Sequence, residues 1–309
     1  MKKAACALFC LTFLLLPLCG CKGYRETDGE YFVSGVCFEK EDGLFTVDIE
    51  VLPLESGKDE SESKVFSADG KTVYEAANNT VSLMPKTAVF DHCGTAVISA
   101  KIKGDDLKAV IKYLYDTKNL NLGIHLFISG DVKSVLACEA QSMSVGYDIM
   151  AVESNIKKST GVDFKNKYYE VVSRRMSHGG FCLPRVERNG DRPEISGQYL
   201  YVGFSPAAVL DAKESIFYNI VYSGSSGGEI SAGGRRCRVD KISSKIKRRG
   251  DTLEIGIKCR YRHKSDKADA EIKSEVEKLF LFPESAEVFM PLYGGDCEGI
   301  KNVEVTVRE

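Results

Sequence analysis

The sequence predicts a multi-domain protein of the α+β or mixed α/β class, in which each domain is a mixed or antiparallel sheet with packed helices. The chain has 309 residues, more than one hydrophobic core usually organises. Residues 44–51 alternate apolar and polar side chains, which is typical of a half-buried strand. Between residues 94 and 141 strand and helix patterns alternate, and this order predicts parallel strands joined by a right-handed crossover.

The first expected domain is an N-terminal α/β domain at residues 21–160. Its strands are expected at Tyr31–Phe38, Leu44–Leu54, Gly94–Ile102 and Leu122–Ser129, and its helices at Asp105–Lys118 and Asp131–Gln141. In the second strand we expect Asp48 and Glu50 to lie on the face that meets water. Thr72 and Glu75 have the spacing of a capping box, so a helix is expected to begin there and to end before Pro85.

Two smaller domains are expected to follow, a middle α/β domain at 161–225 and a shortened C-terminal domain at 226–309, an antiparallel sheet plus a helix. Ser144–Gly161 is interpreted as a helix-tolerant connector, and the Gly/Ser-rich stretch Ser223–Gly234 as a linker at a boundary. The other expected elements are helices at Asp163–Met176, Glu214–Val221 and Lys267–Phe280 and strands at Phe181–Glu187, Tyr199–Phe204, Arg236–Lys247, Thr252–His263 and Val303–Val307.

The N-terminus has the pattern of an export signal. Lys2 and Lys3 precede an apolar run, Ala4–Leu18, which is shorter than the roughly 20 residues that a membrane-spanning helix needs. The run closes with Leu18-Cys19-Gly20-Cys21, which resembles a bacterial lipobox. We therefore expect a signal peptide at 1–20, cleavage before Cys21, and a lipid on the Cys21 sulfur that anchors the protein to a membrane.

Composition and cysteine spacing exclude several kinds of function. The formal net charge is −2, and no excess of basic residues favours nucleic acid as a partner. The cysteines are widely spaced, with no pattern of Cys and His that is typical of a metal site. Cys237 and Cys259 are the first pair to test for a disulfide.

Two short patterns carry residue types that catalysis uses, but neither supports an enzyme. In Asp91-His92-Cys93 the neighbouring His92 and Cys93 point to opposite faces of an extended segment, so we expect His92 to have a structural role. Gly224-Ser225-Ser226-Gly227-Gly228 matches the GxSxG pattern, yet no helical period follows it, as a nucleophile elbow requires. We expect no catalytic residue, no metal, and no cofactor apart from the covalent lipid on Cys21.

Basic residues gather on the hairpin of the last domain. In its second strand Lys258, Arg260 and Arg262 alternate with apolar residues and so share the outward face. One interpretation is a solvated sheet face. The other is an electrostatic contact with anionic lipid headgroups or an acidic partner.

Several segments, in order, resemble the GerC-type lipoprotein subunits of spore-germination nutrient receptors. Besides the lipobox, the similar segments are Arg25-Glu26-Thr27, Gly35–Glu39, Gly70–Ala76, Asp91-His92, Asp106–Tyr115, Gly123–Leu136, Leu183-Pro184, Gly197–Phe204 and Glu214. The resemblance marks Gly35, His92, Pro184 and Glu214 as family-motif residues. It implies three mixed α/β domains at the outer face of the cell or inner spore membrane.

The same resemblance implies the partners and the activity. They are the lipid bilayer and two integral membrane subunits of the A and B type, with which the chain would act in receptor assembly and signal coupling, without catalysis. Two alternatives from other classes stay open: a stand-alone surface lipoprotein that binds a small molecule or cell-wall fragment, and a surface hydrolase with a cysteine or serine nucleophile.

Overall fold

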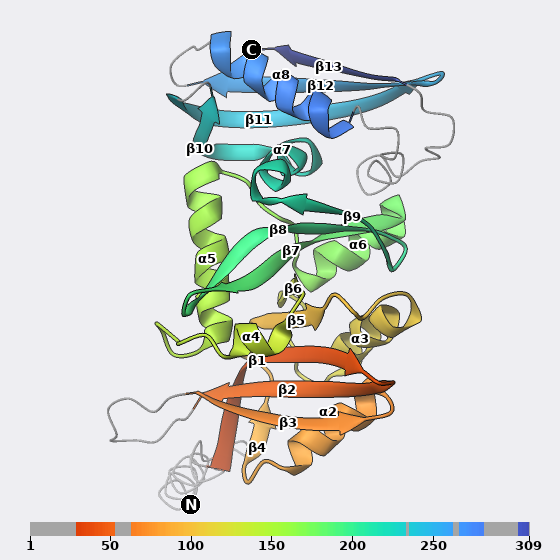
Figure 1. The fold of residues 1–309 in the computed structure, drawn as a ribbon, viewed down its shortest axis with the longest axis vertical. Coiled ribbons are helices and arrows are strands. Elements are labelled where there is room, and N and C mark those ends of the chain that lie inside the picture. The colour runs from red at the N-terminus through yellow and green to blue at the C-terminus, as the bar shows by residue number, and fades with distance from the viewer. Residues whose placement is uncertain (1–28, 53–62, 233–234, 262–265, 281–301, 309) are drawn as a thin grey trace, which may run out of the picture.

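The computed structural model describes residues 29–52, 63–232, 235–261, 266–280 and 302–308 (Figure 1). Within these ranges the strands form two sheets, a mixed sheet of nine strands and a second sheet of four. Helices pack on both, so the predicted α+β class is confirmed. None of the helices in the described part is long and apolar enough to cross a bilayer.

The larger sheet, sheet A, is parallel in its centre and antiparallel at both sides. Its strand order is β3 (Lys64–Gly70), β2 (Leu44–Leu52), β1 (Glu30–Glu41), β5 (Thr95–Ser99), β6 (His125–Ser129), β7 (Gly180–Asn189), β8 (Arg192–Val202) and β9 (Ser205–Asp211). A short strand, β4 (Thr87–Val89), runs parallel to the start of β1. Strands β1, β5 and β6 are parallel neighbours, as the strand–helix–strand pattern predicts.

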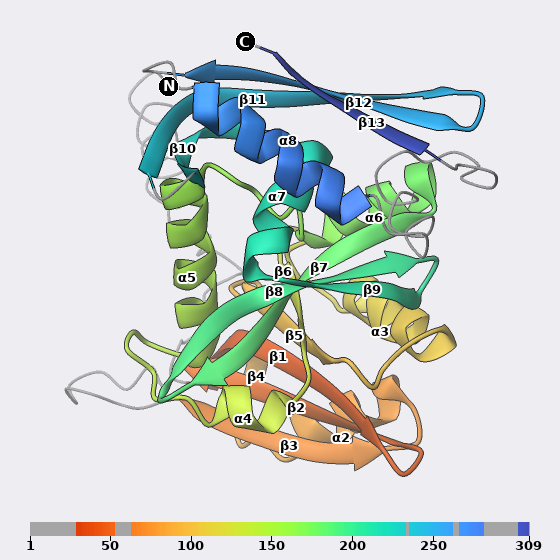
Figure 2. The same cartoon turned by 45° about the horizontal axis from the view of Figure 1, so that its top comes forward.

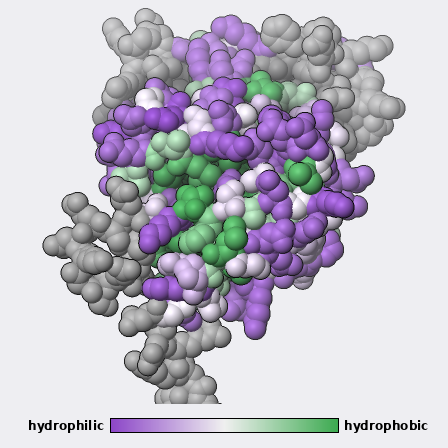
Figure 3. Space-filling model, turned by 60° about the horizontal axis from the view of Figure 1, so that its bottom comes forward, coloured by the Kyte–Doolittle hydropathy of each residue, from purple (hydrophilic) through white to green (hydrophobic). Residues whose placement is uncertain are grey.

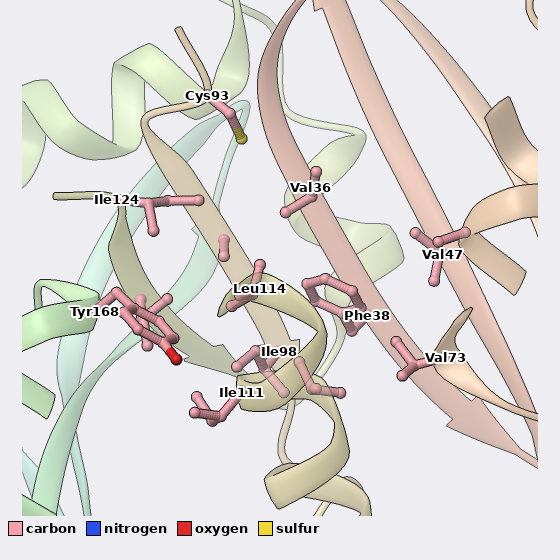
Figure 4. Close-up of a cluster of buried hydrophobic side chains, with 14 of the residues drawn as sticks. Val36, Phe38, Val47, Val73, Cys93, Ile98, Ile111, Leu114, Ile124 and Tyr168 are labelled. Atoms are coloured by element: carbon pink, nitrogen blue, oxygen red, sulfur yellow. The ribbon is translucent and has the colours of Figure 1, made fainter. Parts of the chain in front are cut away.

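Helices cover both faces of sheet A. One face carries α2 (Val73–Ser82), α3 (Asp105–Asp116) and α6 (Tyr168–His178), and Figure 4 shows Phe38, Ile98 and Leu114 meeting in the core beneath them. The other face carries α4 (Val132–Leu136) and α5 (Val145–Thr160), which pack on Cys37, Val97 and Phe127. The two sets of strand residues alternate, as a sheet buried on both faces requires.

The smaller sheet, sheet B, follows the order β10 (Ser225–Ala232), β11 (Arg235–Arg249), β12 (Thr252–Tyr261) and β13 (Asn302–Arg308). Strands β11 and β12 form the predicted hairpin, and β13 runs parallel to β12. Helices α7 (Ala212–Tyr222) and α8 (Asp266–Phe280) pack on one face of this sheet through Tyr218, Ile272 and Val276 (Figure 2).

The helix ends follow their capping residues. Thr72 accepts a hydrogen bond from the Glu75 amide at the start of α2, as the sequence predicts, while the Glu75 carboxylate reaches back to the Lys71 amide instead of the Thr72 amide that closes a capping box. Strands β6 and β7 lie on either side of the predicted domain boundary at residue 160 and pair in sheet A. The division into domains stays a prediction.

The prediction of a linker at residues 223–234 is wrong. Residues 225–232 form β10, which pairs antiparallel with β11, for example Ser226 with Lys241. The glycines serve close packing: at Gly228, where φ is +148°, a Cβ atom would lie 2.1 Å from the carbonyl carbon of Thr160 at the end of α5. The Gly/Ser-rich composition that suggested a linker belongs to a strand, in which a glycine allows close contact with a helix terminus.

Other boundaries also differ. The connector expected at Ser144–Gly161 is the helix α5, with Ser144 as its N-cap. Strand β9 was not expected, and α6 begins at Tyr168, five residues later than Asp163. A Cys237–Cys259 disulfide does not fit the register, because Cys259 lies opposite Ile242, five residues from Cys237 and about 16 Å along the strand.

Candidate functional site

His92 and Cys93 do not form a catalytic pair. The Cys93 side chain is 2% exposed, its Sγ lies 3.7 Å from the carbonyl oxygen of Thr95, and burial raises its pKa to about 12. A thiol in this state is not the thiolate that nucleophilic catalysis needs. The exposed His92 ring instead lies against Phe32, 5.5 Å between centroids.

His125 has a structural partner in a helix. Its Nδ1 lies 2.6 Å from Glu153 Oε2, and the Glu153 side chain is 8% exposed. His125 belongs to β6 and Glu153 to α5, so the contact fixes the middle of this helix on sheet A. The sequence placed His125 in a strand but gave no sign of its partner.

The Glu50 carboxylate holds the start of the same helix. Glu50 is 2% exposed, although the strand pattern predicted that it would face water. The amides of Val145 and Gly146 donate to its two oxygens at 2.9 and 3.0 Å, and the hydroxyls of Ser34 and Ser63 donate at 3.0 and 2.9 Å. A negative charge beside the first turn of a helix stabilises it. The prediction failed because α5 covers this face from a position about a hundred residues later in the chain.

Two of the family-motif residues, Gly35 and Pro184, lie in strands of sheet A. Gly35 lies in β1 beside the Glu50 carboxylate, where an added Cβ would approach Oε2 to 3.4 Å. A cavity of about 10 Å³ lies next to it, room for about one water molecule. Pro184 is buried in β7, opposite Gln198.

Glu214, the fourth motif residue, caps α7. Its carboxylate accepts from the Asp211 amide at 2.9 Å, and Asp211 Oδ1 accepts from the Glu214 amide at 2.8 Å. This reciprocal capping box was readable in the sequence as Asp211 and Glu214 three residues apart. It defines the start of a helix that packs under sheet B.

The outward face of sheet B gathers positive charge around a surface depression. The depression has a volume of about 620 Å³ and also contains Glu254 and Glu304. We call its cationic lining the basic face: Lys245, Lys247, Arg249, Lys258 and Arg308. Of these, Arg249 is paired with Glu254 at 3.3 Å.

Like charges lie next to one another on this sheet. Lys258 lies beside Arg308 in the register of β12 and β13, and Lys241 lies opposite Arg260 in β11 and β12. Neighbours of like charge lower the stability of a sheet, and in the same register Glu254 lies beside Glu304. Lys258 and Arg260 are exposed as predicted, whereas Arg262 and the lipobox cysteine Cys21 lie outside the described residues.

A model of the spore germination protein N-terminal domain matches residues 23–188, more than half of the chain. Among solved structures, the chain is similar to one titled the crystal structure of the GerBC protein, with 12% identity, a TM-score of 0.44, and coverage of 88% of this chain and 94% of that one. No curated protein matches it. The chain therefore belongs to the family of spore germination proteins that share this N-terminal domain, which confirms the GerC-type resemblance of its motifs.

Proposed function

We propose that this chain is the lipoprotein C subunit of a spore nutrient-germinant receptor. A lipid on Cys21 would hold it at the outer face of the membrane, and it would act by assembly and signal coupling with integral membrane subunits of the A and B type. The family match carries this proposal, because it begins at residue 23, two residues after the lipobox cysteine. The matched region thus begins directly after the proposed anchor.

A role without catalysis agrees with the chemistry of the described candidates. The Cys93 thiol is buried, with a pKa of about 12, and the GxSxG serines belong to strand β10 rather than to a turn before a helix. His92 packs against the Phe32 ring, and His125 contacts the Glu153 carboxylate. Cys93, His92 and His125 therefore each have a structural contact that accounts for their position.

The alternative of a small-molecule lipoprotein has weaker support. The cavity at Gly35 admits about one water molecule. The depression on the basic face and a second one, of about 550 Å³ between α5 and β11, are open and lined mainly by charged and hydroxyl side chains. Sites for small molecules are mostly apolar and enclose their ligands, so these surfaces suit a charged macromolecule better.

The anchor is tested with two cysteine variants of the full-length precursor. We expect Cys21→Ala to lose the lipid adduct in intact-mass analysis and to leave the membrane fraction. Cys19→Ala is the matched control, because it changes the other cysteine of the same motif and should be processed normally. Lipid on the Cys21→Ala protein, or none on the native protein, would contradict the anchor.

The partners are tested by purification of the tagged protein from detergent-solubilised spore membranes. We expect two polytopic membrane proteins to copurify with it. If the acylated protein comes alone from mildly solubilised membranes, the receptor assignment is wrong even where the anchor is right.

A further inference from the structure

Apolar side chains lie uncovered at the end of sheet A where the described chain begins (Figure 3). Leu83 is 60% exposed and Val81 37% exposed. Three partly buried residues, Met84, Ala88 and Phe90, pack beside them against the core. We call these five residues the apolar end; together they are the last turn of α2 and the strand β4 with its flanks.

The apolar end is held firmly by its backbone. The amides of Leu83 and Met84 donate to the carbonyl oxygens of Thr80 and Val81, which continues the last turn of α2. Pro85 stops the helix, and β4 then pairs with β1, Thr87 beside Glu30. The exposed aliphatic groups therefore project from a fixed turn rather than from a free loop.

Lys86 borders the apolar end and lies over the buried ring of Tyr31. Lys86 Nζ lies 5.3 Å from the centroid of the Tyr31 ring, which itself lies 5.6 Å from the Phe66 ring. A long basic side chain can hold its charge at the level of lipid headgroups while neighbouring aliphatic groups lie deeper. The arrangement has the composition of a membrane-interface contact.

The position of the apolar end in the chain points to the same partner. Glu30, which pairs with Thr87 of β4, is nine residues after Cys21. Nine residues span at most about 30 Å when fully extended, so a lipid on Cys21 keeps this end of the protein close to the bilayer. A stable protein–protein interface involves about 20 residues on each side. The apolar end has five residues, which is too few to form such an interface by itself.

We infer that the apolar end docks on the lipid bilayer, with Val81 and Leu83 entering its interface and Lys86 at the headgroups. This inference rests on the proposed lipid anchor and adds an orientation to it. One short chain segment would leave the protein free to turn, whereas the anchor and the apolar end together present one side of sheet A to the membrane.

The chain contains no tryptophan, so a single introduced one reports its surroundings without background. We would place it by Leu83→Trp in the acylated full-length protein, with Val81→Trp as a second probe. Met176→Trp is the matched control, because Met176 is 81% exposed on α6, away from β4 (Figure 1). The proteins are bound to phosphatidylcholine–phosphatidylglycerol vesicles with or without bromine on the acyl chains.

We expect the residue-83 and residue-81 probes to show blue-shifted emission and to lose most of their fluorescence to brominated lipid, and the residue-176 probe to show neither effect. If the proteins float with the vesicles but all three probes stay unquenched, the anchor stands and the inference is overturned. If the acylated proteins do not float at all, both the anchor and the inference are overturned. A protein partner on the apolar end predicts the unquenched result with lipid alone.

Discussion

The apolar end beside β4 and the basic face of sheet B lie at opposite ends of the molecule and differ in what they can bind (Figure 1). The first exposes Val81 and Leu83 on a fixed helical turn next to the start of the described chain. The second places Lys258 beside Arg308 around an open depression. Apolar burial drives the first kind of contact and charge the second.

This difference predicts how the protein is oriented on the membrane. If the lipid anchor and the apolar end face the bilayer, the basic face points away from the anionic headgroups. That orientation favours an acidic protein surface over lipid as the contact of the basic face. The sequence alone left these two partners open, because the spacing of Lys258 and Arg260 describes a charged strand face and not its distance from the membrane.

Helix α5 connects the two sheets and so fixes the position of the apolar end relative to the basic face. Its first amides bond to Glu50 of sheet A, and its last residue, Thr160, lies against Gly228 of sheet B. A change at either end of α5 should therefore loosen the connection between the apolar end and the basic face.

The largest effect is expected for Glu50→Ala. It removes the acceptor of two buried amides, of the buried Ser34 hydroxyl and of the half-buried Ser63 hydroxyl, and each buried donor without a partner costs about 1–3 kcal/mol. We expect the free energy of unfolding in urea to fall by at least about 3 kcal/mol. Glu41→Ala is the control, since this glutamate is 60% exposed and its pairing with Lys101 should contribute less than about 1 kcal/mol. Equal losses in the two variants would mean that Glu50 does not hold α5.

The next largest effect is expected for Gly228→Ala. The new methyl group would lie 2.1 Å from the Thr160 carbonyl carbon, so β10 or the end of α5 must move, at a cost of about 2–3 kcal/mol. We expect a lower urea midpoint and faster hydrogen exchange in β10 and β11. Gly227→Ala is the control: it also has a positive φ, +73°, but no atom lies within 4 Å of the added Cβ, so only the backbone strain of about 1 kcal/mol applies. A smaller loss at Gly228 than at Gly227 would contradict the close packing.

A double charge reversal, Lys258→Glu with Arg308→Glu, tests whether the basic face points away from the membrane. We expect flotation of the acylated protein on anionic vesicles to stay within about twofold of the native level, while binding to poly-glutamate falls and loses its salt dependence. If the basic face contacted the leaflet, flotation would drop at least about tenfold, because each basic residue near an anionic surface adds about 1 kcal/mol. That drop would reverse the orientation drawn from the apolar end.

Local patterns predicted local structure well. The N-cap at Thr72 and the alternation in β12 depend on residues a few positions apart, and the strand–helix–strand order depends on consecutive elements; the structure has all three. The same kind of signal at Asp211 and Glu214 was present and was overlooked.

Features that depend on distant segments could not be predicted in this way. The period of β2 separates its two faces but cannot tell that the start of α5 later binds Glu50, or that Asp48 is buried as well. The glycines near Gly228 look like a linker until the position of Thr160 is known. The apolar end was missed because Val81 and Leu83 are ordinary helix residues, and only the fold leaves them uncovered.

The smallest effect is expected for Asp163→Asn, which tests the connection of α5 by pH. Burial alone would raise the pKa of Asp163, but hydrogen bonds from Lys157, in the last turn of α5, and from Lys165 lower it to about 2. The ordinary value is about 3.9, so the carboxylate stabilises the fold above that pH, and this stabilisation is lost as the pH falls from about 4 to about 2.

Because the Asp163 side chain is 27% exposed, we expect the variant to lose about 1–2 kcal/mol at pH 7 and to match the native protein near pH 2. Asp191→Asn, whose carboxylate is 71% exposed beside Arg188, should change the free energy of unfolding by less than about 1 kcal/mol at either pH. The backbone carbonyl of Asp163, which the substitution keeps, also accepts from Ser223 Oγ just before β10, so any loss reports the side-chain carboxylate alone. A loss of the same size at both pH values would show that the side-chain shape, and not the ion pairs with Lys157 and Lys165, holds the end of α5 against sheet B.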